Sequence, residues 1–121
     1  MGIDVENLII KPAPMRSNRK TNATFTFDGL VDKTEDNPVT VTLSVPTDDP
    51  NVSFVNKNGK SVKSISLDPF NFKVGSSDSY PQTIKVNIAG SGGKPGVCDV
   101  SLRAVTKIGV SSEVDSFLSY K

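Results

Sequence analysis

The sequence predicts an all-β fold, an immunoglobulin-like β-sandwich of about seven to nine antiparallel strands in two sheets. Apolar and small polar residues alternate in segment after segment, most regularly in VTVTLSVP at 39–46. Helical spacing hardly occurs, and turn signals recur about every 8–12 residues. Because each alternating strand has one apolar face, two facing sheets bury both apolar faces. A closed barrel satisfies the same pattern and is the alternative architecture.

The N-terminal part of the chain predicts two strands. The first covers about 3–10 and ends at KPAP, where Pro12 and Pro14 suit a sheet edge or a kink at which the chain changes sheets. The second strand follows in NATFTFDGLV at 22–31. We expect Asp28-Gly29 to break this second strand, because this dipeptide is a common turn signal.

The middle of the chain predicts a hairpin after the strand at 39–45. A short apolar segment at 52–55 precedes Asn58-Gly59, and both of these residues tolerate the positive φ that tight turns require. Apolar residues at 65–74 are expected to continue beyond this turn. The segment GSSDSYP at 75–81, which includes Tyr80, is expected to be a loop.

The C-terminal part predicts alternating strands at 82–88, from Val97 onward, and at the end of the chain after KIGVSS. GSGGKPG at 90–96 lacks the Gly-Lys-Ser/Thr ending of a phosphate-binding loop, so we expect a flexible connection there. The core is expected to hold apolar side chains from both sheets, namely Phe25, Phe27, Val41, Leu43, Phe72, Ile84, Val86, Val100 and Leu102.

The overall composition indicates one domain, 1–121, without catalysis. The 14 basic and 13 acidic residues leave a net charge of +1, which predicts neither nucleic acid nor membrane insertion. The chain has no His, so the usual general base and the commonest metal ligand are missing. We therefore expect no enzyme activity and no cofactor. The single Cys98 cannot form an internal disulfide and is expected to be a buried, inert thiol.

The first ten residues, MGIDVENLII, lack the basic-then-apolar order of a signal peptide, and no stretch reaches the ~20 apolar residues of a membrane span. We expect either an intracellular protein or one module of a longer exported protein, with Met1-Gly2 added in front of the module. We predict the second, an extracellular or cell-surface location.

One acidic segment is a candidate calcium site. Asp28, Asp32, Glu35 and Asp36 are expected in one loop between strands, and calcium prefers several hard oxygen ligands. Their spacing does not follow the EF-hand pattern, so ordinary polar turn chemistry is the favoured interpretation and no metal is predicted. Asp48-Asp49 is expected to be a turn of the same kind.

Two further surface features are weak signals. Asn22 and Asn51 begin Asn-x-Ser/Thr sequons, which would carry glycans only in an exported protein. A carbohydrate-binding platform would need Tyr80, Phe117 or Tyr120 to be exposed in a cluster, although aromatic residues are more often core.

The order of segments resembles the immunoglobulin-like repeat modules of bacterial and archaeal surface proteins, such as the cell-adhesion-related CARDB domain. The resemblance rests on the opening strand IDVENLII, on TFTF at 24–27, and on the penultimate strand, where Pro95, Gly96, Val100, Leu102 and Ala104 match the family's pattern. It implies an extracellular spacer, adhesion unit or accessory domain without catalysis.

The sequence thus predicts a non-catalytic module of a surface or secreted protein, which acts as a structural spacer or as a protein-interaction or adhesion unit. The expected partner is a protein or a cell-surface component. Two alternatives remain open: a carbohydrate-binding accessory module, and a viral or phage decoration or fibre domain that makes its contacts through a sheet edge.

Overall fold

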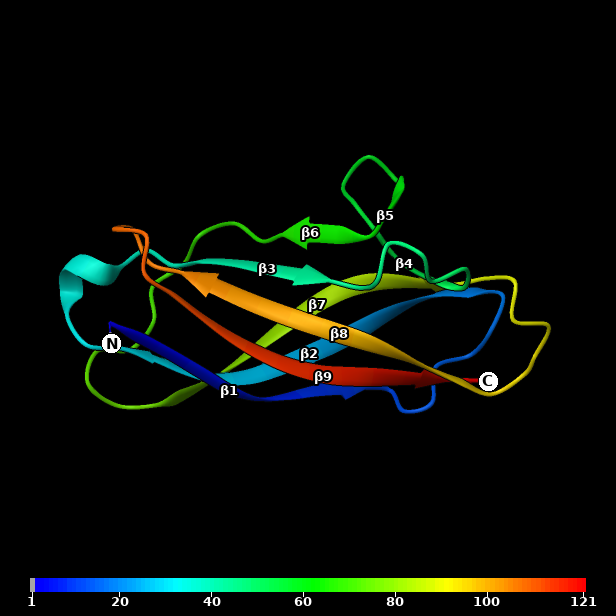
Figure 1. Cartoon of the computed structure of the whole chain (residues 1–121), viewed down its shortest axis with the longest axis horizontal. Helices are drawn as coiled ribbons and strands as arrows, with labels where there is room; N and C mark the ends of the chain where they lie inside the picture. Colours follow the sequence, from blue (N-terminus) through cyan, green and yellow to red (C-terminus); the bar gives the residue numbers. More distant parts are fainter. Residues whose placement is uncertain (1) are drawn as a thin grey trace.

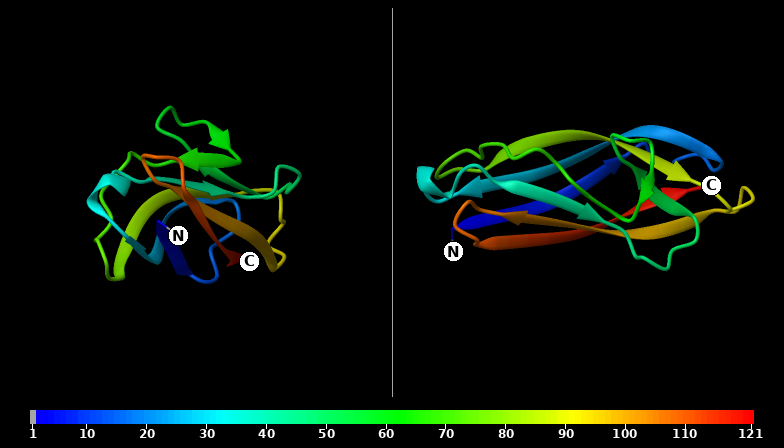
Figure 2. Two further views of the ribbon diagram at one scale, coloured as in Figure 1. Left: turned by 60° about the vertical axis from the view of Figure 1, so that its left-hand side comes forward. Right: turned by 90° about the horizontal axis from the view of Figure 1, so that it is seen from above.

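Two antiparallel β-sheets pack face to face in an immunoglobulin-like sandwich (Figures 1 and 2). The computed structural model describes residues 2–121. One sheet has the order β1-β2-β7-β4-β5 and the other has the order β6-β3-β8-β9. The strands are β1 (Ile3–Lys11), β2 (Arg19–Val31), β3 (Thr40–Ser44), β4 (Val52–Val55), β5 (Ser61–Val62), β6 (Ser64–Ser66), β7 (Asp78–Ile88), β8 (Gly96–Val105) and β9 (Ser111–Tyr120), with a 3-10 turn at Thr34–Asp36.

Strand β3 shows how alternation places side chains. Val41 and Leu43 are fully buried between the sheets, whereas the intervening Thr42 lies on the outer face. On that face the Thr42 hydroxyl contacts the Ser66 hydroxyl of β6 at 2.8 Å. The predicted all-β sandwich is confirmed, and each strand contributes one face to the interior.

A single hydrophobic cluster fills the space between the sheets. All nine side chains that the sequence assigned to the core are buried in it. Phe25 and Phe54 meet edge to face with ring centroids 6.0 Å apart, a geometry that aromatic pairs favour. Cys98 is also buried, as predicted.

The chain changes from one sheet to the other at both sides of the sandwich. Strand β1 pairs with β2, and after Pro12 and Pro14 the backbone at Met15 bonds to β9 of the opposite sheet. Of the two roles that the sequence allowed for these prolines, a sheet edge or a change of sheet, the structure shows the change of sheet. On the other side, β5 pairs with β4 of the first sheet and β6 pairs with β3 of the second.

The expected break at Asp28-Gly29 is wrong. Strand β2 runs through both residues, and Gly29 is opposite Val5 of β1 and Asp78 of β7. The glycine is needed for a different reason. A Cβ atom there would lie 2.8 Å from the Phe72 ring, so the missing side chain makes room for an aromatic ring rather than for a turn.

The middle of the chain holds one confirmed prediction and two corrections. The hairpin predicted at Asn58-Gly59 is confirmed, because β4 and β5 pair antiparallel across residues 56–60, although only Gly59 has a positive φ there. Tyr80 lies in β7 rather than in a loop, because its ring packs into an aromatic cluster with Phe72. The segment 65–74 pairs as a strand only at β6, followed by single bridges.

Candidate functional site

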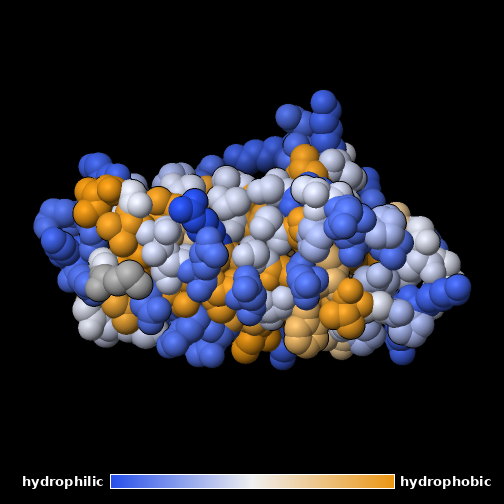
Figure 3. All heavy atoms as spheres, viewed as in Figure 1, coloured by the Kyte–Doolittle hydropathy of each residue, from blue (hydrophilic) through white to orange (hydrophobic). Residues whose placement is uncertain are grey.

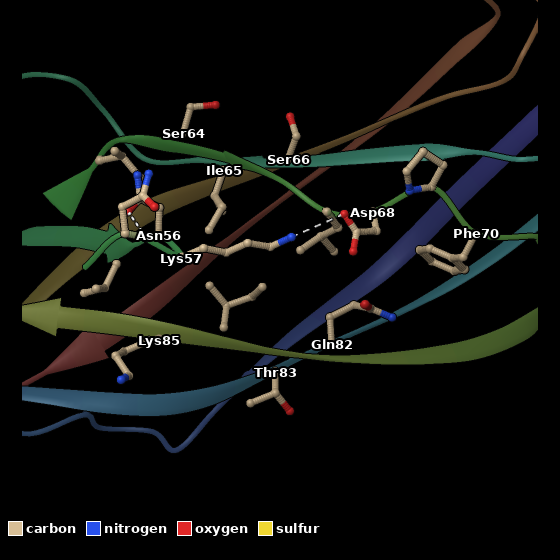
Figure 4. Close-up of a pocket in the computed structure, with 16 residues that line it drawn as sticks. Asn56, Lys57, Ser64, Ile65, Ser66, Asp68, Phe70, Gln82, Thr83 and Lys85 are labelled. Atoms are coloured by element: carbon tan, nitrogen blue, oxygen red, sulfur yellow. Dashed lines mark hydrogen bonds and ion pairs between the residues drawn. The ribbon is translucent and has the colours of Figure 1, made fainter. Parts of the chain in front are cut away.

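An open groove runs along one side of the sandwich, with a volume of about 980 Å³. It lies between β6, at the edge of one sheet, and β7 of the other, and the loop 56–58 and the segment 67–70 also line it. In Figure 4, Ile65 points from β6 into the groove, while its neighbours Ser64 and Ser66 point away from it.

One wall of this groove is an unpaired strand edge. Strand β4 pairs with β7 only at Val86–Ile88, because β4 has four residues and β7 has eleven. Among the residues that the structure describes, no strand pairs with β7 on this side over 78–85. The backbone of β7 next to the groove is therefore free for pairing.

Strand alternation identifies which backbone groups of β7 face the groove. The N–H of Ala89 donates to the carbonyl of Asn51 on the β4 side. Alternate residues point their N–H and C=O to the same side, so Lys85, Thr83 and Pro81 also face that side. Proline has no N–H. At Pro81 the missing N–H would face the groove rather than β2, so no hydrogen bond between β7 and β2 is lost. The pairing of Phe54 with Val86 already engages the carbonyl of Lys85. The free edge thus offers two donors, the N–H groups of Thr83 and Lys85, and two acceptors, the carbonyls of Pro81 and Thr83.

The floor of the groove is apolar and partly exposed. Half-buried hydrophobic side chains pack there against the core, namely Val62, Ile65, Leu67 and Phe70. Above them, Lys57 Nζ reaches across to Asp68 Oδ1 at 3.6 Å (Figure 4). Both side chains are about 90% exposed (88% and 90%), so this ion pair contributes little to stability and opens readily.

The structure does not bring the four candidate calcium ligands into one group. Asp28 lies in β2 and accepts a hydrogen bond from Asn7, while Asp32 and Glu35 are exposed. Asp36 is fully buried, and one of its oxygens accepts the N–H of Lys33. Among residues 2–121, no group of three or more His, Cys, Asp or Glu side chains could hold a metal ion.

The aromatic candidates for a carbohydrate platform do not form an exposed cluster. Tyr80 stacks on Phe72, with centroids 4.9 Å apart, near the beginning of β7. Tyr120 is buried at the end of β9, and only Phe117 is exposed. Its exposed neighbour on the outer face is Val97 of β8, and apolar side chains appear between polar ones over this part of the surface (Figure 3).

The two sequon asparagines have different surroundings. Asn22 is exposed on the outer face of β2, opposite Lys85 of β7. Asn51 is half-buried, and its side-chain amide donates to the Tyr120 hydroxyl at 3.0 Å. The Asn22 side chain is therefore accessible, whereas that of Asn51 is half-buried and hydrogen-bonded.

A polar cluster around Asp49 fixes the loop between β3 and β4. Its carboxylate accepts the N–H groups of Asn51 and Val52, at 2.8 and 2.9 Å, and Lys63 Nζ donates to the backbone carbonyls of Asp49 and Val52. Although partial burial acts to raise it, these N–H bonds, with help from Cys98 and Lys63, hold the pKa of Asp49 below its usual value.

The Cys98 thiol lies beside this cluster. Burial raises the pKa of Cys98 to about 12, and the nearby Asp49 carboxylate adds to the effect. A thiol of this kind is protonated at neutral pH and is a poor nucleophile.

Sequence reasoning did not find the groove. The only signal was the difference in length between the short apolar segment at 52–55 and the long alternating strand that ends at Ile88. Two strands of unequal length leave part of an edge unpaired. Their neighbourhood, however, depends on a crossover between the sheets that no local pattern encodes.

No protein-family model matches this chain, and no curated protein matches it. Among solved structures that do, the sporulation control protein Spo0M from Bacillus subtilis has a TM-score of 0.55 and 11% identity, over 100% of this chain and 50% of that one. The alkylpurine DNA glycosylase AlkC of Pseudomonas fluorescens, bound to DNA with an abasic site analogue, has a TM-score of 0.53 and 13% identity, over 99% of this chain and 30% of that one. BcpA, the major pilin subunit of Bacillus cereus, has a TM-score of 0.50 and 14% identity, over 96% of this chain and 40% of that one.

These similarities show the fold alone, because all three identities are very low. The chain spans between 30% and 50% of the length of these three proteins. No helix in the part of the chain that the structure describes is long and apolar enough to cross a membrane.

Proposed function

We propose that this chain is a non-catalytic interaction module of a surface or secreted protein, and that it binds an extended segment of a partner protein along the free edge of β7. The observation that carries the proposal is the unpaired stretch of β7 beside an apolar groove. An added strand would pair with this edge and direct alternate side chains onto the groove floor, a recurrent mode of peptide recognition.

The geometry defines the preferred segment. The N–H groups of Thr83 and Lys85, with the carbonyls of Pro81 and Thr83, provide up to four hydrogen bonds, each worth ~0.5–1.5 kcal/mol net. Specificity would come from the floor, which accepts apolar side chains at every second position. When its exposed ion pair with Asp68 opens, the Lys57 side chain, which reaches across the groove, favours an acidic residue at one end of the bound segment.

The shape of the molecule also suits a module within an elongated protein. The N and C labels lie at opposite ends of the long axis (Figures 1 and 2). A chain that passed through several such modules would therefore extend by one module length at each step. The surface location and the resemblance to adhesion-related repeats are predictions from the sequence, and both are consistent with this proposal.

The experiment is a binding selection with a backbone-specific control. A phage-displayed library of random 12-residue peptides is selected on the immobilised protein, and each enriched peptide is measured against Thr83→Pro and Thr83→Val variants. The Pro variant removes the N–H that faces the groove, whereas the Val variant keeps it. Since the same N–H does not bond to β2, both variants should fold.

We expect enriched peptides with apolar residues at alternate positions, which bind the wild type and Thr83→Val but lose at least tenfold in affinity for Thr83→Pro. Enrichment of peptides that bind all three proteins equally would refute pairing at β7, as would no enrichment. The fibre-type alternative would appear as self-association of the protein that Thr83→Pro abolishes, measured by sedimentation velocity.

A further inference from the structure

A second cavity, of about 530 Å³, lies at the end of the sandwich where β2 begins and β9 ends, on a different part of the surface from the groove. Three cationic residues line it, Arg16, Arg19 and Lys121, together with Ser17, Asn18 and Gly93. No acidic residue lines it. The groove, by contrast, carries both signs of charge.

The backbone holds the three cations around this cavity. Ser17 and Asn18 form a turn that places the α-carbons of Arg16 and Arg19 within about 7 Å of each other, and Asn18 takes a φ of 56° in it. The N–H of Ser17 donates to the carbonyl of Lys121 at 2.9 Å, and the N–H of Lys121 donates to the carbonyl of Met15.

The glycine-rich loop is attached to the same turn. The hydroxyls of Ser91 and Ser17 contact each other, and Ser91 is buried. This contact fixes the loop that carries Gly93, whose φ of 81° and missing side chain leave that wall of the cavity open. The site is thus built from three segments that are distant in the sequence and bonded to one another.

Arg16, Arg19 and the Lys121 side chain take part in neither of the two ion pairs among residues 2–121, which are Lys57–Asp68 and Arg103–Glu113. Like charges around one cavity repel one another, and an anion that binds between them removes this repulsion. Guanidinium groups form paired hydrogen bonds with phosphate or sulfate oxygens, which a point charge such as chloride cannot match.

We propose that this basic cavity binds a phosphate or sulfate group, with Arg16 and Arg19 as its main ligands and Lys121 as a third cation. This proposal does not depend on the strand-binding groove, because the two sites share no residue. The bound group could be a free ion or part of a larger anionic molecule, and the experiment separates these two cases.

The test is an NMR titration of the ¹⁵N-labelled protein with sodium phosphate at constant pH and constant ionic strength, with sodium chloride removed as phosphate is added. A second arm uses a short polyphosphate chain. We expect saturable shifts at the amides of Ser17, Asn18 and Gly93, with a dissociation constant near or below ~1 mM for phosphate. A tighter constant for polyphosphate would indicate an anion carried on a polymer.

Matched variants distinguish binding at this cavity from a general effect of the protein's net charge. Arg19→Glu should lose at least tenfold in affinity for phosphate. Arg19→Lys should lose less, because Lys keeps the positive charge although it lacks the guanidinium group that forms paired hydrogen bonds. Lys57→Glu makes the same change of charge at the distant groove and should bind phosphate like the wild type. The proposal fails if the shifts do not saturate, or if Arg19→Glu and Lys57→Glu weaken binding equally.

Discussion

Replacing Gly29 with Ala tests the packing that positions the first half of β7. A methyl group at this position would lie 2.8 and 3.1 Å from two ring atoms of Phe72 and 3.4 Å from the Phe27 ring. Carbon atoms at best contact are about 3.5–4.0 Å apart, so the Phe72 ring must move. It has little space, because its centroid lies 5.2 Å from that of Phe70 and 4.9 Å from that of Tyr80.

The expected magnitude follows from two opposing effects. Overpacking of a buried site costs ~1–3 kcal/mol. Replacing Gly with Ala lowers the entropy of the unfolded chain and returns ~0.4–1 kcal/mol. We therefore expect Gly29→Ala to lower the free energy of unfolding by ~1–2 kcal/mol.

The assay is urea unfolding followed by circular dichroism, with Thr24→Ala on the exposed face of the same strand as the control. The control should change the free energy of unfolding by less than ~0.5 kcal/mol. Combining Gly29→Ala with Phe72→Leu should give less destabilisation than the sum of the two single changes, because the smaller side chain relieves the overlap. A Gly29→Ala protein as stable as the wild type would refute the close-packing explanation.

Three further predictions concern the polar cluster beside β4. Lys63→Met should lower the free energy of unfolding by ~1–3 kcal/mol, because it leaves the carbonyls of Asp49 and Val52 without their donor; an unchanged urea midpoint would contradict this. Because the pKa of Asp49 is lowered in the folded state, its charge stabilises the fold above pH ~4 and this contribution is lost as the pH falls below that value. Asp49→Asn should accordingly be less stable than the wild type at pH 7 and approach it near pH 2, and a difference independent of pH would be inconsistent with the assignment. Cys98 should react with a disulfide reagent at pH 7 only after unfolding, and rapid modification of the folded protein would show that the thiol is not buried as described.

The architecture could be predicted from the sequence because each strand carries its own signal. In VTVTLSVP the alternation alone identifies Val41 and Leu43 as interior residues, and the structure buries both. The prolines after the first strand carried similar local information. Patterns of this kind depend only on the two-residue period of an extended chain.

Gly29 shows the limit of such local reasoning. Asp28-Gly29 has the composition of a turn, but the ring of Phe72, 43 positions later in the chain, requires a glycine inside a strand. Tyr80 was misplaced for a related reason, because its surroundings of Ser and Asp indicate a loop while its ring packs against Phe72. In both cases a tertiary contact overrides the local preference.

The groove could not be predicted from the sequence for a topological reason. Its two walls, β6 and β7, belong to different sheets, and the chain reaches them through the sheet change at β5 and β6. The basic cavity likewise brings together Arg19 and Lys121, which are at opposite ends of the sequence. The scattered Lys and Arg residues gave no signal of it, because only the fold brings them together.

Amide hydrogen exchange along β7 is the most direct test of the central claim that this strand has a free edge beside the groove. The backbone N–H groups of Gln82 and Ile84 point toward β2, whereas those of Thr83 and Lys85 point toward the groove. We predict alternating protection, with slow exchange at Gln82 and Ile84 and fast exchange at Thr83 and Lys85. Uniformly slow exchange over 82–85 would show that this edge is already paired and would contradict the proposed strand-binding function.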